Sequence, residues 1–284
     1  MKNDKAIKIL VCCHQKVDWL KNDIYVPVHC GKIANKINLG IQGDDTGDNI
    51  SSKNPNYCEL TALYWAWKNW CDIDYIGLNH YRRYFCKDKL MPTSRVYVYE
   101  SVSIAADHIV MENDIERYLC LYDIILPKKN YCPFNLRTEY SYMLNSIEYK
   151  RCKDVVMRLF PEYIPSFEQI MYYGNSYSAC NMFIMKWELF DKYAEWMFSI
   201  LFELEKQLCI DGYTGYYKRI YGYVSERLLN IFVLHHNLNA KYLPVAMISN
   251  TYKTGLIKET CKRIISDISF IINKPRKKEE IFSI

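Results

Sequence analysis

The sequence predicts an α/β domain with a mostly parallel central sheet flanked by helices. Short continuous apolar runs, such as IKILVCCH at residues 7–14, are typical of strands that are covered on both faces. Loops and segments with helical spacing separate these runs, and strand, loop, helix, strand is the order found in α/β domains. A chain of 284 residues, half of them hydrophobic, can also bury a large core.

The first part of the chain is expected to contain strands, one long loop and one helix. Pro27 is unfavourable in a central strand, so its segment is a second strand or a loop. Asn54 is a good N-cap and Pro55 suits the first helical position, which predicts where the helix begins. In chain order the expected elements are a strand at 7–14, a strand or loop at 23–31, an ordered loop at 38–54, a helix from 54 and a strand at 75–79.

The remaining elements continue the same pattern. Apolar residues recur at helical spacing from Leu189 to Leu204, which is typical of a helix that packs on a core. The expected elements are a strand at 121–129, a strand followed by a long helix within 177–208, a helix from about 224 and a last strand at 240–248. Residues 1–255 are therefore expected to form one domain, followed by a basic amphipathic tail at 256–284.

Charge and cysteine content exclude some classes of protein. The chain has 37 basic and 32 acidic residues, and a net charge of +5 is too small for the basic surface of a nucleic-acid-binding protein. None of the twelve cysteines forms a C-x-x-C pair or has the spacing of a structural zinc site, so buried free thiols are expected. The start of the chain lacks a signal peptide or membrane span, which indicates a cytoplasmic protein.

The tail at residues 258–280 combines isoleucines at helical spacing with lysines and arginines. Such a segment can lie on an anionic membrane surface, which would place the protein at the inner face of the membrane. It can equally be a terminal helix that packs on the domain and ends in solvated charges.

The segment YIGLNHYRRYF at 75–85 places polar groups at the end of a buried strand. Ligands of open α/β sheets collect beyond the carboxyl ends of the strands, so Asn79, His80, Arg82 and Arg83 are expected to bind a ligand there. Arginine matches phosphate oxygens in two-point contacts, which favours a diphosphate. Alternatively, one arginine pairs internally with an acid of the loop described next.

The loop GDDTGDNIS at 43–51 is a second candidate site. Asp44, Asp45, Asp48 and Asn49 could hold a cation or accept hydrogen bonds from sugar hydroxyls. The spacing does not match the calcium-binding loop of twelve residues. Aspartate and glycine are also ordinary turn formers, so the loop can be purely structural.

Glu226, in SERLLN at 225–230, is the candidate general base. It is expected near the start of a helix, where an acid is also favoured by the helix dipole alone. His235 and His236 are adjacent and diverge in direction, so they are interpreted as packing or capping residues.

Four segments carry a resemblance to one family: GDDTGDNIS, YCELTALYWAWKN, YIGLNHYRRYF and CNMFIMKWELFDKYAEWMFSILFELE. They resemble the capsular and exopolysaccharide glycosyltransferases that were long classified only as a domain of unknown function, over about residues 7–248. The resemblance implies a GT-A-like, Rossmann-like fold, a nucleotide-sugar donor and a glycan acceptor that is lipid-linked, in capsular, exopolysaccharide or O-antigen synthesis. A UDP-linked galactofuranose or galactose is the implied donor.

The sequence departs from the usual GT-A pattern at the metal site. The expected Asp-x-Asp would follow the central strand, whereas Asp72 and Asp74 precede it and the strand ends in NHYRR. We therefore expect His80 and the two arginines to neutralise the leaving diphosphate in place of a metal. No cofactor is firmly implied, although the aspartate loop could hold Mn²⁺ or Mg²⁺, or the sugar.

The resemblance also suggests roles for the other candidates. Glu226 would deprotonate the acceptor hydroxyl, which implies an inverting hexosyltransferase. His14 and Gln15 would border the base or ribose of the donor.

Other functions fit parts of the sequence. A non-catalytic module that binds nucleotide sugars or glycans would use the 26 tyrosines and 6 tryptophans for stacking. A sugar phosphotransferase would also use arginines and aspartates, but no P-loop or kinase motif is present. Binding to RNA is disfavoured by the small net charge.

Overall fold

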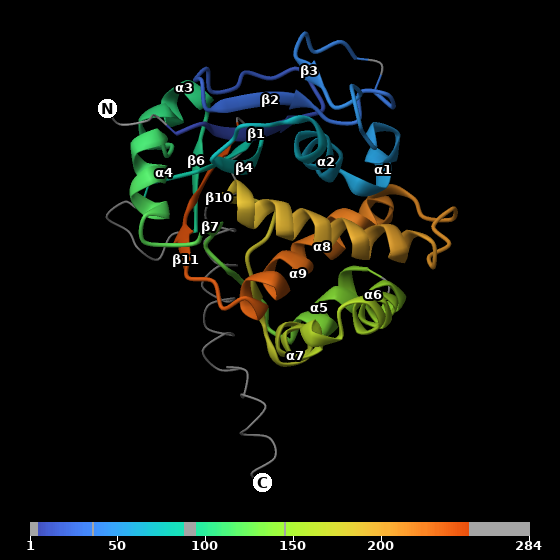
Figure 1. Ribbon diagram of the computed structural model, residues 1–284. Helices are drawn as coiled ribbons and strands as arrows, with labels where there is room; N and C mark the ends of the chain where they lie inside the picture. Colours follow the sequence, from blue (N-terminus) through green and yellow to red (C-terminus); the bar gives the residue numbers. More distant parts are fainter. Residues whose placement is uncertain (1–4, 36, 88–94, 145, 250–284) are drawn as a thin grey trace. The chain divides into compact units, whose positions relative to one another are not determined.

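The computed structural model describes residues 5–35, 37–87, 95–144 and 146–249 (Figure 1). Contacts between Cα atoms divide these residues into two compact units, which are described separately here. The first unit comprises residues up to 128 together with 180–195 and 238–249, and the second comprises 129–179 and 196–237. The expected basic tail at 256–284 lies outside the described residues.

The first unit is built around one mixed sheet whose main path is β11-β7-β10-β4-β1-β2-β3, with β5, β6 and β12 joined beside it. β1 is parallel to β2 and β4, and β10 is antiparallel to both of its neighbours. This arrangement confirms the predicted fold class. The strands are β1 Ile7–Cys13, β2 Tyr25–His29, β3 Gln42–Gly43, β4 Tyr75–His80, β5 Arg83–Phe85, β6 Val96–Tyr99, β7 Ile124–Pro127, β10 Phe183–Lys186, β11 Ala240–Leu243 and β12 Val245–Ile248.

Helices cover both faces of this sheet. Alternate residues of β1, from Ile7 to Cys13, pack in one buried cluster with residues of α3 (Val102–Ala105) and α4 (Glu112–Leu119). Cys12 points to the opposite face, where its Sγ contacts the carbonyl oxygen of Glu59 just before α2 (Leu60–Asn69). Figure 1 shows α3 and α4 beside one face of the strands and α2 beside the other. Burial on both faces explains why β1 is continuously apolar.

β2 contains Pro27 without losing a hydrogen bond of the sheet. Ile9 donates to the carbonyl of Ile24, whereas the carbonyl of His29 accepts from Asp44 on the far side of β2. Backbone groups alternate in direction along a strand, so the missing N–H of Pro27 faces the same way as His29. The short strand β3 begins its pairing opposite Val28, and Pro27 therefore lies where β2 is an edge.

The helix predicted to begin at residue 54 is two helices, α1 (Asn54–Tyr57) and α2, and this corrects the expectation of one continuous helix. The break is at Cys58, whose φ is 55° and ψ is −130°. Asn54 is the first residue of α1 instead of its N-cap, and its Nδ2 donates to the carbonyl oxygen of Cys58 at 2.7 Å. This side-chain bond stabilises the break, because it occupies a carbonyl that leaves the helical pattern.

Two further boundaries differ from the sequence-based expectation. The last predicted strand is divided at Pro244: β11 pairs with β7, whereas β12 pairs with β5 and β6. Proline cannot donate to a ladder, so the chain changes partners there. The helix α9 (Ile220–His235) begins at Ile220, earlier than the predicted start near residue 224.

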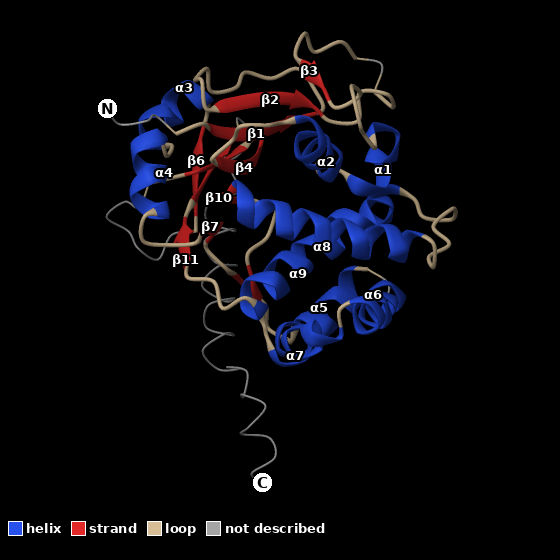
Figure 2. Cartoon of the chain, in the orientation of Figure 1, coloured by secondary structure: helices blue, strands red, loops and turns tan. Residues whose placement is uncertain are grey.

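The second unit consists mainly of helices (Figure 2). His235 stacks on Tyr163 at 3.6 Å between ring centroids, and Nε2 of His236 lies 2.7 Å from the Tyr163 hydroxyl, so both histidines pack as predicted. None of the helices in the described ranges is long and apolar enough to cross a membrane. The main elements are α5 Leu136–Met143, α6 Ser146–Leu159, α7 Ile164–Glu168, α9, β8 Asn130–Tyr131, β9 Ser176–Tyr177 and the second half of α8 Trp187–Glu205.

Candidate functional site

Polar side chains gather at the carboxyl ends of β1 and β4 in the first unit. These parallel strands are in register, with Cys12 opposite His80. His14 follows β1, and its ring meets the edge of Tyr81 with the centroids 4.9 Å apart. The structure therefore places His14 beside the residues that follow β4, as expected for groups at one edge of a parallel sheet. Gln15 is the next residue and is half-buried.

The two arginines lie in and after a tight turn. Tyr81 and Arg82 form the turn between β4 and β5, and Arg83 pairs with His80 across it. The Arg82 guanidinium is 5.0 Å from the centre of the Tyr81 ring, and this side chain is exposed. Arg83 is the first residue of β5 and is half-buried. The sequence did not indicate that β4 continues into a hairpin here.

His80 is fixed at the end of β4 by a backbone carbonyl. Its Nε2 lies 2.7 Å from the carbonyl oxygen of Cys180. A carbonyl oxygen only accepts hydrogen bonds, so Nε2 carries the proton in this arrangement. The ring is thus held with a defined orientation at the edge where the donor site is expected.

Asn79 is fully buried on β4. Neither its Oδ1 nor its Nδ2 has a hydrogen-bond partner within the described residues. An amide that is buried without hydrogen bonds costs about 1–3 kcal/mol, and such groups are uncommon in proteins. Asn79 therefore retains one acceptor and two donor positions in the sheet beside His80.

Sequence reasoning missed a second pair of residues at this edge. Asn181 Nδ2 donates to Oε1 of Glu59 at 2.7 Å. Cys180 and Asn181 have φ of 72° and 52°, a left-handed conformation that is common for glycine, tolerated by asparagine and unfavourable for cysteine. Glu59 lies within the segment YCELTALYWAWKN, which predicts a helix and carries part of the family resemblance but assigns no role to Glu59. That segment is the only sequence signal that could have indicated Glu59.

The carboxylates of the aspartate loop make contacts within the first unit. Asp44 is buried and accepts hydrogen bonds from the backbone of Gly31 at 2.7 Å and from Ser51 Oγ at 2.5 Å. Asp45 pairs with Lys32 at 3.4 Å. These contacts hold the loop itself. The alternative prediction was that Arg82 or Arg83 pairs with an acid of this loop. Among the described residues, no ion pair joins either arginine to the loop.

Two other residues of the loop are also engaged locally. The Tyr64 hydroxyl donates to Asp48 Oδ1 at 3.3 Å. Asn49 bonds to the backbone of its own turn, with Nδ2 donating to Gly47 and Oδ1 accepting from Ser51. Within the described ranges, no three His, Cys, Asp or Glu side chains are grouped as a metal site.

Glu226 lies in the second unit, on α9. It is the seventh residue of that helix and lies beyond the first turn, so the prediction that it lies near the helix start is wrong. The helix dipole favours an acid only in the first turn and does not explain Glu226. Its Oε2 is 3.0 Å from Nη1 of Arg227, and Nη2 of Arg227 is 2.8 Å from Oε2 of Glu139. The Arg227 side chain is only 7% exposed. A buried guanidinium therefore holds two carboxylates in place.

Tyr177 and Asn230 complete this arrangement. The Tyr177 hydroxyl lies 3.4 Å from Nη2 of Arg227. Burial opposes the charged form of Arg227, but Tyr177 and the two carboxylates outweigh it, and the pKa of Arg227 stays above its ordinary value. Asn230 donates to the carbonyl of Glu226 at 2.8 Å and exchanges two hydrogen bonds with the backbone of Ser178. The segment after β9 is thereby tied to the Glu226 turn of α9.

Comparison with known proteins adds three findings. Residues 8–237 match the family described as "Domain of unknown function (DUF4422)". The chain is also similar to a solved structure described as the apo form of the bifunctional glycosyltransferase WbbM, with 32% sequence identity and a TM-score of 0.77. That match covers 87% of this chain but 46% of the other, so this chain spans about half the length of the protein it matches. No curated protein is significantly similar to the chain.

Proposed function

We propose, from the premise that the chain belongs to the DUF4422 family, that it is a glycosyltransferase using a nucleotide-sugar donor. The observation that carries the proposal is the position of His14, His80 and Arg82 at the carboxyl ends of two neighbouring parallel strands, β1 and β4, with Asn79 buried one position earlier on β4. Small ligands of α/β sheets bind at this edge. The similarity to a bifunctional glycosyltransferase supports the same class of activity.

The donor diphosphate is assigned to the hairpin between β4 and β5. Arg82 is exposed in the turn, and Arg83 follows it at the start of β5. Guanidinium groups bind phosphate oxygens in two-point contacts, and each charge-assisted hydrogen bond contributes roughly 1.5–3 kcal/mol. Asn79, His14 and Gln15 are assigned to the sugar, base or ribose. The family resemblance favours UDP-linked galactofuranose or galactose.

The chemical step follows from these assignments. Glu226 takes the proton of an acceptor hydroxyl, and that oxygen forms a bond to the anomeric carbon. The bond from this carbon to the diphosphate breaks, and the nucleoside diphosphate leaves with the electron pair. His80, Arg82 and Arg83 stabilise the charge that develops on it. Direct attack gives inversion at the anomeric carbon.

The proposed acceptor rests on the resemblance alone, whereas the proposed location at a membrane rests on the tail alone. The proposed acceptor is a lipid-linked glycan of capsular, exopolysaccharide or O-antigen synthesis. Residues 258–280 carry the basic and apolar pattern that would hold the protein at an anionic membrane. Removal of residues 258–284 should abolish co-sedimentation with anionic liposomes, and unchanged sedimentation would contradict this role of the tail.

Calorimetry with UDP tests the donor site. The parent is compared with the Arg82→Ala, Arg83→Ala double variant, each with EDTA and with Mn²⁺. We expect binding in EDTA that weakens about 100-fold or more in the double variant, because two charged contacts are lost. Arg117→Ala is the control, since Arg117 is an arginine of the same unit that is 66% exposed and pairs with Asp114 on its own helix. Binding that requires Mn²⁺ and survives both arginine changes would overturn the assignment and favour a metal held by the aspartate loop.

Glu226→Gln separates catalysis from binding. A transferase should keep its affinity for UDP in this variant, because Glu226 is not assigned to the donor, and should lose turnover of a UDP-sugar. If the parent binds UDP-sugars but releases no UDP in the presence of glycan acceptors, the protein is a binding module instead.

A further inference from the structure

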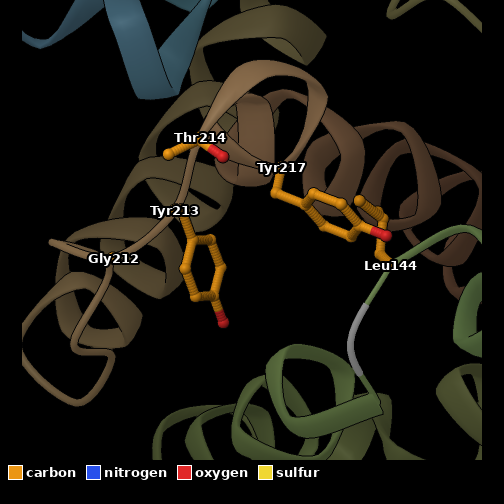
Figure 3. Close-up of a pocket in the computed structure, with 5 residues that line it drawn as sticks. All are labelled: Leu144, Gly212, Tyr213, Thr214 and Tyr217. Carbon is orange, nitrogen blue, oxygen red and sulfur yellow. The ribbon is translucent and has the colours of Figure 1, made fainter.

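The second unit contains a pocket of about 330 Å³ that the proposed donor site does not use. Tyr213 and Tyr217 extend from one segment of the chain, and the Tyr217 ring lies beside Leu144 (Figure 3). Gly212 and Thr214 are the other described residues that line the pocket. Its volume is at the lower end of the range for small-molecule sites, about 300–1,000 Å³.

The segment that forms the pocket exposes aromatic rings. Tyr216 and Tyr217 are 48% and 49% exposed, although aromatic side chains normally contribute to cores and interfaces. The Tyr216 ring also contacts the Tyr223 ring on α9, with the centroids 4.7 Å apart. The Tyr217 ring of the pocket wall is therefore accessible to a ligand, and the neighbouring Tyr216 ring is held against α9.

A buried carboxylate orients the Tyr213 side chain. The Tyr213 hydroxyl donates to Oε1 of Glu148 at 2.7 Å, and Glu148 is 1% exposed. Its Oε2 has no hydrogen-bond partner within the described part of the chain. A carboxylate with an unused oxygen behind the wall can accept a further hydrogen bond. The pocket thus combines the faces of two tyrosine rings with the Thr214 hydroxyl, and Glu148 holds the Tyr213 side chain in a fixed orientation.

We propose that this pocket binds a sugar ring of the glycan acceptor. Sugar rings present apolar C–H faces and polar edges, which suit aromatic faces combined with tyrosine and threonine hydroxyls. The described residues that line the pocket include no cationic side chain, so a phosphate or nucleotide is disfavoured. A purely apolar chain would offer no hydrogen-bonding group to the Thr214 hydroxyl. The inference rests on the proposed glycosyltransferase function, since it identifies where the acceptor binds.

Saturation-transfer NMR on the full chain tests the pocket directly. The probes are methyl glycosides of galactopyranose, galactofuranose, glucose and N-acetylglucosamine. Tyr217→Ala removes an exposed ring and Thr214→Val removes an exposed hydroxyl, so both variants are expected to fold. We expect the dissociation constant of a bound probe to rise roughly tenfold in Tyr217→Ala, because one face of the sugar loses its stacking partner.

The matched control is Tyr142→Ala. Tyr142 is 78% exposed in the same unit but does not line the pocket. Its loss should leave the probes bound as in the parent. A transfer signal that Tyr142→Ala weakens as much as Tyr217→Ala, or the absence of transfer to any probe, overturns the proposal.

Donor binding distinguishes this inference from the proposed function. UDP calorimetry on the same variants should give the parental affinity, because neither Tyr217 nor Thr214 is assigned to the donor. If UDP binds and no sugar probe does, the pocket assignment fails and the donor site stands. If sugar binds at the pocket and UDP does not bind at all, the glycosyltransferase proposal fails while the pocket remains a sugar site.

Discussion

Asn181 and Glu59 are joined by a hydrogen bond of 2.7 Å, although they are 122 residues apart in the chain. Cys180, the residue before Asn181, accepts from His80 through its carbonyl oxygen. A bend of two left-handed residues therefore connects the start of α2 to the end of β4. The orientation of His80 depends on this bend, since its hydrogen-bond partner belongs to the bend.

Substitutions of Asn181 should separate its side-chain bond from its backbone conformation. Asn181→Ala loses the bond to Glu59 and leaves a non-glycine residue at φ 52°. Asn181→Gly loses the same bond but favours that φ. We expect both variants to unfold at lower urea concentration than the parent, with the alanine variant about 1 kcal/mol less stable than the glycine variant.

Asn237 is the matched control for this comparison. It has φ of 50° and is exposed beyond the end of α9. Asn237→Gly should cost little stability, because the glycine suits the conformation and the site is on the surface. Equal stability of the glycine and alanine variants at residue 181 would contradict backbone strain there.

The sheet could be predicted because its strands are locally encoded. β1, β4, β7 and β10 are apolar runs, and burial on both faces requires such runs whatever their partners are. The position of His80 and Arg82 was predictable for the same reason, since polar residues that follow a buried strand must leave the core at its carboxyl end.

Other features depend on contacts that local sequence does not contain. The break at Cys58 needs the Asn54 side chain and the left-handed backbone, whereas the local pattern alone continues as one helix. The Glu59 and Asn181 pair joins distant segments, and one sequence without an alignment carries no signal for such a contact. The proline at residue 244 indicates where the last strand is divided. No local feature of the sequence indicates that β11 and β12 pair with different strands.

Arg82 should contribute to donor binding without contributing to stability. Its side chain is exposed in the turn, so Arg82→Ala should keep the parental urea midpoint. We expect UDP to bind about tenfold or more weakly, as one charged contact is lost. Arg82→Lys keeps the charge but not the two-point geometry, and its affinity should fall between those of the parent and the alanine variant. If calorimetry gives the lysine and alanine variants the same affinity, the positive charge at residue 82 does not contribute to UDP binding.

Arg227 should be essential for the stability of the second unit. Arg227→Met leaves the carboxylates of Glu139 and Glu226 without their shared cation, and breaking a buried ion pair typically costs about 3–5 kcal/mol. The addition of Glu139→Gln should restore part of this loss in urea unfolding. Arg158→Met is the comparison, because Arg158 is 53% exposed and an exposed ion pair contributes about 0–1 kcal/mol. Similar losses in the two single variants would contradict the special role of Arg227.

Glu148 should make stability depend on pH in a direction opposite to that of most carboxylates. Burial raises the pKa of Glu148 above its ordinary value of 4.5, although the hydrogen bond from Tyr213 partly opposes this. The folded state therefore holds the Glu148 proton more tightly than the unfolded state. The stability from this group is fully present below pH 4.5 and is lost as the pH rises through the folded pKa.

Glu148→Gln isolates this contribution, because glutamine can still accept from the Tyr213 hydroxyl but does not ionise. Urea unfolding of both proteins between about pH 4 and about pH 8 gives the difference in the free energy of unfolding. Groups such as Glu203, whose pKa is lowered to about 2 by Lys206 and Arg158, are common to both proteins and cancel. The difference should shift in favour of Glu148→Gln as the pH rises and then become constant. A difference that stays constant across the whole range would mean that Glu148 titrates alike in the folded and unfolded states, and that its burial behind Tyr213 does not penalise its charge.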